Sequence, residues 1–230
     1  MSTTDPTDVR SGRSRIDRLD RDIAALVVID AQNDFCHPEG LSARQGKDVG
    51  PLQAPLRRVH ALIEAAHRYD VPVYLVQNEH TPDSDTPEWL ERHPNYWREQ
   101  NCQKDTWGAE FCGFAPAAGD VVVTKHRYSA FIGTTLESRL REAGRRSLLF
   151  AGFTTATCVE SSLRDAVCLD FLATVVEDCC AAYDPQAHAH AIAAMGTGFG
   201  EVTTYDRIVT RWSESSAEPA VGTPAVGAAG

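Results

Sequence analysis

The sequence lacks the features that mark membrane, secreted and nucleic-acid-binding proteins. No stretch approaches the roughly 20 apolar residues of a membrane-spanning helix, and the N-terminal MSTTDPTDVRSGRSRIDRLDRD has no apolar run of a secretory signal. The chain also lacks a basic excess, since its formal net charge is -10, whereas phosphate binding needs a basic face. We therefore expect a cytoplasmic protein that binds neither nucleic acid nor a membrane.

The seven cysteines lack the spacing of a redox or zinc motif. No Cys-x-x-Cys pair is present, which argues against a thiol oxidoreductase. Cys102 and Cys112 have no second pair at zinc-ligand spacing. We expect free thiols, no metal and no cofactor, and the pattern does not assign roles to Cys179 and Cys180.

What is present is an ordinary globular composition: 230 residues, of which 43% are hydrophobic and 23% charged. We expect one domain over residues 22–212. Residues 1–21 are polar and carry both charges, which predicts a flexible N-terminal arm. Residues 213–230 (SESSAEPAVGTPAVGAAG) are too small and too rich in Gly, Pro and Ala to bury much apolar surface, which predicts a disordered tail.

Short apolar runs alternate with amphipathic stretches along the domain. Continuous apolar runs fit strands buried on both faces, and the intervening stretches have helical periodicity. This alternation predicts an α/β protein with a three-layer α/β/α architecture and a mostly parallel sheet of about six strands. The expected strands are 23–29, 71–76, 121–123, 147–150, 172–176 and 202–205; the expected helices are 52–69, 134–143, 159–167 and one starting at Asp184.

Three chemically reactive side chains follow expected strands, where ligands bind in open α/β sheets. Cys158 lies where a helix begins, and a helix N-terminus stabilises a thiolate. Lys125 would lower the thiol pKa, and Asp30 would move its proton. Each residue also has a structural alternative: a buried apolar cysteine, a surface lysine whose stem is covered, and an aspartate that caps a turn. Asp34 competes with Asp30, which we prefer because it directly follows the strand.

The segment from residue 78 to 119 interrupts the strand–helix alternation. It holds three of the four tryptophans, and an excursion of this length in a compact domain is usually a lid or binding loop. Trp107 could line a pocket there, although a core position would suit an aromatic ring equally well.

Four blocks in this order resemble the isochorismatase-like cysteine hydrolase superfamily: VVIDAQNDF, DTWGAEF, VVVTKHRYSAF and AGFTTATCVESSLRDA. The resemblance runs from about residue 22 to about 212. It implies an isochorismatase-like, Rossmann-like sheet and a catalytic triad of Asp30, Lys125 and Cys158. It also implies a cis peptide bond between Phe153 and Thr154, with the backbone N–H groups of Thr154 and Cys158 forming an oxyanion hole.

Departures from particular branches of the superfamily narrow the chemistry. Isochorismatases that cleave a vinyl ether lack the cysteine, and the Asp-x-His metal motif of nicotinamidases is replaced here by residues 77–80 (QNEH). Asn78 and Tyr128 match substrate-binding positions of ureidoacrylate amidohydrolases. Residues 177–180 match biuret hydrolases instead, but the glutamine those enzymes use further on is replaced by residues 195–197 (MGT). The two indications disagree, so the exact substrate stays open.

The resemblance thus implies a cysteine amidohydrolase that cleaves a C–N bond of a small amide or N-carbamoyl (ureido) compound through a thioester-type intermediate and releases ammonia. Vinyl-ether hydrolysis and a nicotinamidase-type activity are the alternatives. The expected partners are the small-molecule substrate and further copies of the chain in a dimer or tetramer. The expected substrate-binding residues are Phe35, Asn78, His80, Trp107 and Tyr128.

Overall fold

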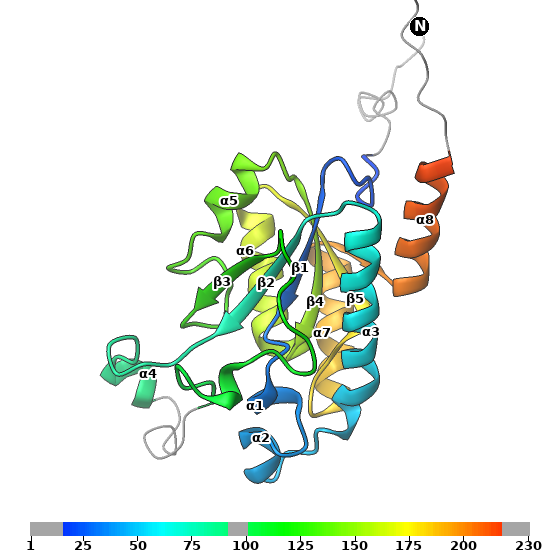
Figure 1. Cartoon of the computed structure of the whole chain (residues 1–230). Coiled ribbons are helices and arrows are strands. Elements are labelled where there is room, and N and C mark those ends of the chain that lie inside the picture. Colours follow the sequence, from blue (N-terminus) through cyan, green and yellow to red (C-terminus); the bar gives the residue numbers. More distant parts are fainter. Residues whose placement is uncertain (1–15, 92–100, 218–230) are drawn as a thin grey trace, which may run out of the picture.

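A computed structural model describes residues 16–91 and 101–217. Its centre is a six-stranded sheet in the order β3-β2-β1-β4-β5-β6, in which all neighbouring strands run parallel (Figure 1). Each run predicted as a strand forms one, and the predicted α/β class is confirmed. The strands are β1 (Ala24–Ile29), β2 (Val73–Asn78), β3 (Val121–Lys125), β4 (Ser147–Phe153), β5 (Leu172–Ala181) and β6 (Glu201–Thr203).

The apolar run of β1 is continuous because this central strand is covered on both faces. Leu26 and Val28 pack in one hydrophobic core, and Val27 and Ile29 pack in the other, as the alternation of side chains along a strand requires. All six residues of β1 are buried. A parallel sheet between two helical layers explains this pattern.

Helices form a layer on each face of the sheet (Figure 1). The helices α3 (Gly50–Arg68) and α8 (Tyr205–Ala217) contribute to one core, and α5 (Leu136–Glu142), α6 (Glu160–Cys168) and α7 (Pro185–Gly198) contribute to the other. Asp184 caps α7 as expected, because its side chain accepts a hydrogen bond from the N–H of Gln186 at 2.9 Å. Shorter elements are α1 (Asn33–Cys36), α2 (Leu41–Arg44), α4 (Pro87–Glu91), the 3-10 turn η2 (Trp107–Ala109) and the π-helical turn η3 (Thr155–Val159).

The ordered structure extends beyond both expected domain boundaries. Arg18 donates to the carbonyl of Ala173 at 2.8 Å, and the carbonyl of Leu19 accepts from the indole N–H of Trp212 at 3.0 Å. Helix α8 continues to Ala217, so residues 213–217 are helical rather than part of a tail. The rest of the expected arm and tail lies outside the described residues.

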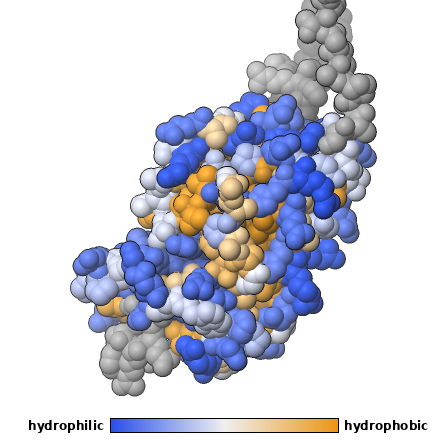
Figure 2. Space-filling model, viewed as in Figure 1, coloured by the Kyte–Doolittle hydropathy of each residue, from blue (hydrophilic) through white to orange (hydrophobic). Residues whose placement is uncertain are grey.

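Apolar surface gathers over the middle of the face on which α3 lies (Figure 2). Val122 of the edge strand β3 is 40% exposed. The expected dimer or tetramer stays a prediction.

Within the described ranges, no helix combines the length and apolar character needed to cross a membrane.

Candidate active site

The candidate site lies where the order of strands reverses. Strands β1 and β4 are neighbours, but the chain leaves β1 toward β2 and leaves β4 toward β5, so a crevice opens at their carboxyl ends. Asp30 directly follows β1, and the turn η3 with Cys158 follows β4. Lys125 is the last residue of β3, and its long side chain spans the intervening strand to reach Asp30.

The structure brings the three predicted catalytic side chains into contact. The Lys125 Nζ atom lies 2.8 Å from Oδ2 of Asp30 and 3.5 Å from Sγ of Cys158. It also donates to the carbonyl of Arg127 at 3.0 Å. Lys125 and Asp30 are each 1% exposed, whereas Cys158 is half-buried. An ammonium group between a carboxylate and a thiol is suited to nucleophilic chemistry.

The electrostatics of the site combine the effect of burial with the charges of Lys125 and Asp30. Burial raises the pKa of Cys158 to about 12, even though Lys125 lowers it, so the thiol is protonated at rest despite the nearby helix start and lysine. Burial also raises the pKa of Asp30, against the opposing effect of Lys125. Burial lowers the pKa of Lys125, but Asp30 and Cys158 together outweigh this and raise it. The resting site is therefore a thiol beside an ion pair and needs a base to form the thiolate.

The backbone has uncommon conformations at the ends of β1 and β4, next to Asp30 and to the turn that carries Cys158. Asp30 has a positive φ of 50°. Gly152 has a φ of 120°, and a Cβ atom there would lie 2.0 Å from the carbonyl oxygen of Ile29. Only glycine allows this close approach of the two strands. The peptide bond between Phe153 and Thr154 is cis, as the resemblance implied.

Side-chain hydrogen bonds fix the turn that carries the cysteine. Ser162 Oγ donates to the carbonyl of Cys158 at 2.6 Å and accepts from the N–H of Ala130 at 2.9 Å. On the other side, Thr155 Oγ1 and His188 Nδ1 lie 2.9 Å apart. The turn η3 is thus held by α6, α7 and the segment after β3. The oxyanion role of Thr154 and Cys158 stays a prediction.

Of the predicted substrate-binding residues, Asn78 and His80 lie together at the end of β2, where Asn78 is the last strand residue. Asn78 Nδ2 is 2.9 Å from His80 Nε2, and His80 Nδ1 is 2.7 Å from Oδ1 of Asp85. The Trp89 ring stacks on His80 at 6.2 Å between centroids and meets the edge of Tyr128 at 5.3 Å. Trp89 and Asp85 therefore belong to this cluster, although sequence patterns did not single them out.

Phe35 and Trp107 lie in two other short elements: Phe35 is in α1, and Trp107 is in η2. Phe35 packs against the core on the α3 side. Trp107 is 44% exposed and has its ring edge-on to His37, with 5.0 Å between centroids. The Asn33 side chain donates to the carbonyl of Trp107 at 2.8 Å and so joins α1 to η2. Substrate binding by Phe35 and Trp107 stays a prediction.

Two buried polar residues that follow β1 hold the backbone around the site, and the sequence analysis did not predict this supporting role. Gln32 accepts from the N–H of Asn78 at 2.8 Å and donates to the carbonyls of Asn78 and Ala109 at 2.8 and 2.7 Å. The Asp34 carboxylate accepts from the N–H groups of Leu41 and Cys102 at 3.0 and 2.7 Å. Asp34 is therefore a structural anchor and not a rival of Asp30. A polar run directly after a buried strand was the available signal.

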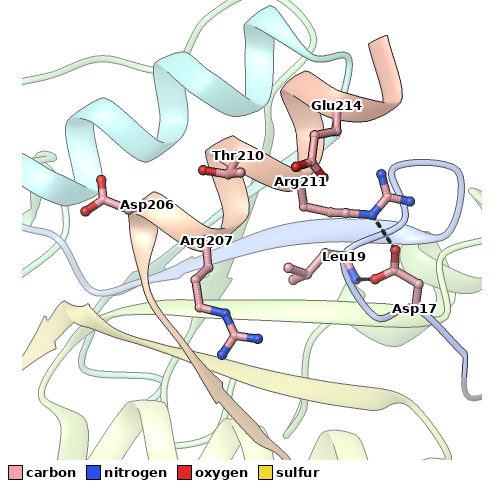
Figure 3. Close-up of a pocket in the computed structure, with 7 residues that line it drawn as sticks. All are labelled: Asp17, Leu19, Asp206, Arg207, Thr210, Arg211 and Glu214. Atoms are coloured by element: carbon pink, nitrogen blue, oxygen red, sulfur yellow. Dashed lines mark hydrogen bonds and ion pairs between the residues drawn. The ribbon is translucent and has the colours of Figure 1, made fainter. Parts of the chain in front are cut away.

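A pocket of about 430 Å³ lies elsewhere, along α8 and the segment before β1 (Figure 3). It is lined by Asp17, Leu19, Asp206, Arg207, Thr210, Arg211 and Glu214. An ion pair between Arg211 and Asp17 at 2.6 Å crosses it. None of the predicted site residues lines this pocket. Within the described ranges, no three His, Cys, Asp or Glu side chains are grouped to hold a metal ion, and the expected absence of a metal stays a prediction.

Comparisons with known proteins agree with the fold. Residues 24–207 match the isochorismatase domain family. The chain is 33% identical over 204 residues to the ureidoacrylate amidohydrolase RutB of Methylobacterium radiotolerans, which covers 80% of this chain and 78% of that protein. The ureidoacrylate amidohydrolase of Azorhizobium caulinodans is 32% identical over 196 residues, or 78% of this chain and 86% of the relative.

Solved structures show the same similarity. A cysteine hydrolase from Pseudomonas syringae pv. phaseolicola superposes with a TM-score of 0.77 at 25% identity, covering 88% of this chain and 97% of that one. An N-carbamoylsarcosine amidase from Thermoplasma acidophilum superposes with a TM-score of 0.64 at 30% identity, covering 80% and 96%. The six-stranded parallel sheet and its helical layers are the fold of an isochorismatase-like hydrolase. The chain belongs to the isochorismatase family.

Proposed function

We propose that this protein is a cysteine amidohydrolase that cleaves a C–N bond of a small amide or N-carbamoyl compound and releases ammonia. The observation that carries the proposal is the position of the Lys125 ammonium group, 2.8 Å from the Asp30 carboxylate and 3.5 Å from the Cys158 sulfur. A base, a cation and a thiol in mutual contact are the groups that covalent acyl transfer requires.

In the first half-reaction, Asp30 accepts the proton of the Cys158 thiol as the sulfur attacks the substrate carbonyl carbon. The raised pKa of Asp30 makes it a better base than an ordinary carboxylate. Lys125 stabilises the negative charge that passes from carboxylate to sulfur. The N–H groups of Thr154 and Cys158 donate hydrogen bonds to the carbonyl oxygen, on which negative charge develops. The C–N bond then breaks, and Asp30 returns the proton to the departing nitrogen.

In the second half-reaction, water replaces the departed amine. Asp30 accepts a proton from this water as its oxygen attacks the thioester carbon. The C–S bond breaks, and Asp30 returns the proton to the Cys158 sulfur, which restores the thiol. An amide gives a carboxylic acid, and a ureido compound gives a carbamate, which decomposes to carbon dioxide and ammonia.

The residues near the triad support a polar substrate. Asn78 and Tyr128 offer a carboxamide and a phenol, which can satisfy the N–H and C=O groups of an amide or ureide. The names of the relatives point the same way, since ureidoacrylate and N-carbamoylsarcosine both contain an N-carbamoyl group. Vinyl-ether hydrolysis is less well supported because it gives the thiol no task. A nicotinamidase-type amidase is the second candidate, favoured by a TM-score of 0.63 at 25% identity to nicotinamidase from Bacillus subtilis.

Ammonia release over a panel of small amides, N-carbamoyl compounds and nicotinamide tests the proposal. Cys158→Ser, which keeps the size of the side chain, should abolish turnover while leaving the unfolding transition unchanged. Mass spectrometry of the wild-type protein, quenched during turnover, should show the acyl or carbamoyl group on Cys158. Retained activity in Cys158→Ser would contradict the cysteine mechanism, and turnover of isochorismate alone would contradict amide chemistry.

A further inference from the structure

Asp85, His80 and Asn78 form a buried hydrogen-bonded chain that ends beside the triad. His80 Nδ1 lies 2.7 Å from the Asp85 carboxylate, and His80 Nε2 lies 2.9 Å from Asn78 Nδ2. All three residues are less than a tenth exposed. Two linked polar contacts in a buried setting fix the orientation of their members far more firmly than contacts in water.

The side chain of Asn78 lies on the same side of the sheet as the nucleophile. Asn78 pairs directly with Lys125 across β2 and β3. Side chains two residues apart share a face of a strand, and Val76 and Val123, two residues earlier in each strand, both pack in the core against which Cys158 lies. Asn78 is therefore next to Lys125 on the face of the sheet that holds the thiol.

The chemistry of the chain sets its direction. A carboxylate only accepts hydrogen bonds, so His80 must carry a proton on Nδ1 to bond Asp85. In the neutral ring Nε2 then only accepts, and its partner on Asn78 must be the donating nitrogen, Nδ2. This leaves the oxygen Oδ1 of Asn78 as the side-chain acceptor. If the direction of these hydrogen bonds were reversed, Asn78 would offer its amide nitrogen, a donor, in place of the oxygen.

We propose that Asp85 and His80 are positioning residues that fix the polarity of Asn78, so that its Oδ1 atom accepts an N–H group of the substrate beside the thiol. The proposal rests on the proposed function for the identity of the substrate, because an amide or ureide supplies such an N–H and an ester does not. The orientation of the chain itself does not depend on any substrate.

A spectroscopic experiment tests the orientation without a substrate. In protein labelled with ¹⁵N-histidine, long-range ¹H–¹⁵N spectra distinguish the two neutral ring forms, and His80→Gln assigns the His80 signals. We expect the neutral ring with the proton on Nδ1. A ring protonated on Nε2, or on both nitrogens at neutral pH, would overturn the proposal whether or not an amide substrate is found.

Kinetics test the consequence, on a primary amide that the wild type cleaves in a Cys158-dependent manner. His80→Gln keeps an oxygen that can accept from Asn78, whereas His80→Leu does not, and both remove the imidazole from Asp85. We expect kcat/KM to be about tenfold lower in His80→Leu than in His80→Gln, the size of one hydrogen bond. In an Asn78→Ala background, and with the methyl ester of the same acid, the two variants should differ by less than about twofold.

The proposal would be overturned if kcat/KM differed between His80→Leu and His80→Gln by the same factor in the Asn78→Ala background, or with the ester. It would also be overturned if the two variants had equal kcat/KM for the amide in the wild-type background. Asp85→Asn keeps the side-chain shape and serves if His80→Leu does not fold. It should lower kcat/KM for the amide several-fold in the wild-type background and by less than about twofold in Asn78→Ala. A purely structural role of Asp85 would lower activity by the same factor in both backgrounds, which contradicts the proposal.

Discussion

Replacing Lys125 by methionine should make the stability of the protein depend on pH through Asp30. The two side chains are each 1% exposed and lie 2.8 Å apart, so Lys125→Met leaves a carboxyl group buried without its counter-charge. Burial already raises the pKa of Asp30 while Lys125 opposes this effect. Without Lys125 the folded-state pKa must rise further, while in the unfolded chain it stays at about 3.9.

The sign and size follow from proton linkage. Above pH about 4 the folded variant keeps a proton on Asp30 that the unfolded chain has lost, so its stability falls as the pH rises toward the raised pKa. The slope is about 1.4 kcal/mol per pH unit for one proton. Lys125→Met/Asp30→Asn has no such proton and serves as the reference. Its advantage over Lys125→Met should be at most about 1.5 kcal/mol near pH 5 and larger by about 2–3 kcal/mol near pH 7.

Urea denaturation of the two variants near each pH measures this difference directly, because other titrating groups contribute equally to both proteins. Wild-type protein, measured in parallel, shows whether either variant has lost two-state unfolding. The reasoning is refuted if the advantage of the double variant is the same near both pH values. It is also refuted if the double variant is no more stable than Lys125→Met near neutral pH.

Three further outcomes follow from the site. Lys125→Ala should slow the alkylation of Cys158 by iodoacetamide about tenfold or more, because Lys125 lowers the pKa of the thiol; Lys104→Ala, at a side chain that is 56% exposed, should not change the rate. Gly152→Ala should cost more than about 3 kcal/mol of stability through its clash with Ile29, whereas Gly144→Ala, where nothing lies within 4 Å, should cost about 1 kcal/mol. Dialysis against a chelator should leave turnover unchanged. His80 is the histidine at the place of the nicotinamidase metal motif, and its Nε2 atom is hydrogen-bonded to Asn78 and not free to bind a metal. Activity that is lost and then restored by zinc or manganese would contradict this.

The sheet could be predicted because a strand that is buried on both faces has a continuous run of apolar residues in the sequence. The run at 23–29 is apolar at every position and the run at 147–150 is apolar except at Ser147, and the strands β1 and β4 that they form lie at the centre of the sheet. The end of the domain was harder to predict. Helix α8 packs Tyr205, Ile208, Val209 and Trp212 against the core on the α3 side, and their spacing of three and four residues is a helical stripe that the sequence analysis did not use. The bond from the indole N–H of Trp212 to the carbonyl of Leu19, which ties this helix to the segment before β1, is not visible in any local pattern.

The triad was accessible from sequence because its members follow strands whose ends must meet. Its supporting residues were not, because their partners are distant along the chain. Gln32 bonds to the backbone of Asn78 and Ala109, and no local pattern encodes contacts across that separation. The net effect on the Cys158 pKa was also out of reach, since the favourable lysine is visible in a motif but the depth of burial is not.

The position of the triad also separates two kinds of change that the protein could undergo. Asp30 and Cys158 follow the two central strands, β1 and β4, whose side chains are also the middle of both cores. Asn78 instead ends β2, and His80 and Asp85 lie in the segment between β2 and β3, which hydrogen-bonds to residues after β1 through Gln32 and Asp34. Phe111 and Cys112 of that segment pack in the core on the α3 side, but its exposed side chains, such as Trp107, can be exchanged without repacking the centre. The scaffold leaves substrate choice open to variation or engineering while the groups that we propose break the bond stay where the core holds them.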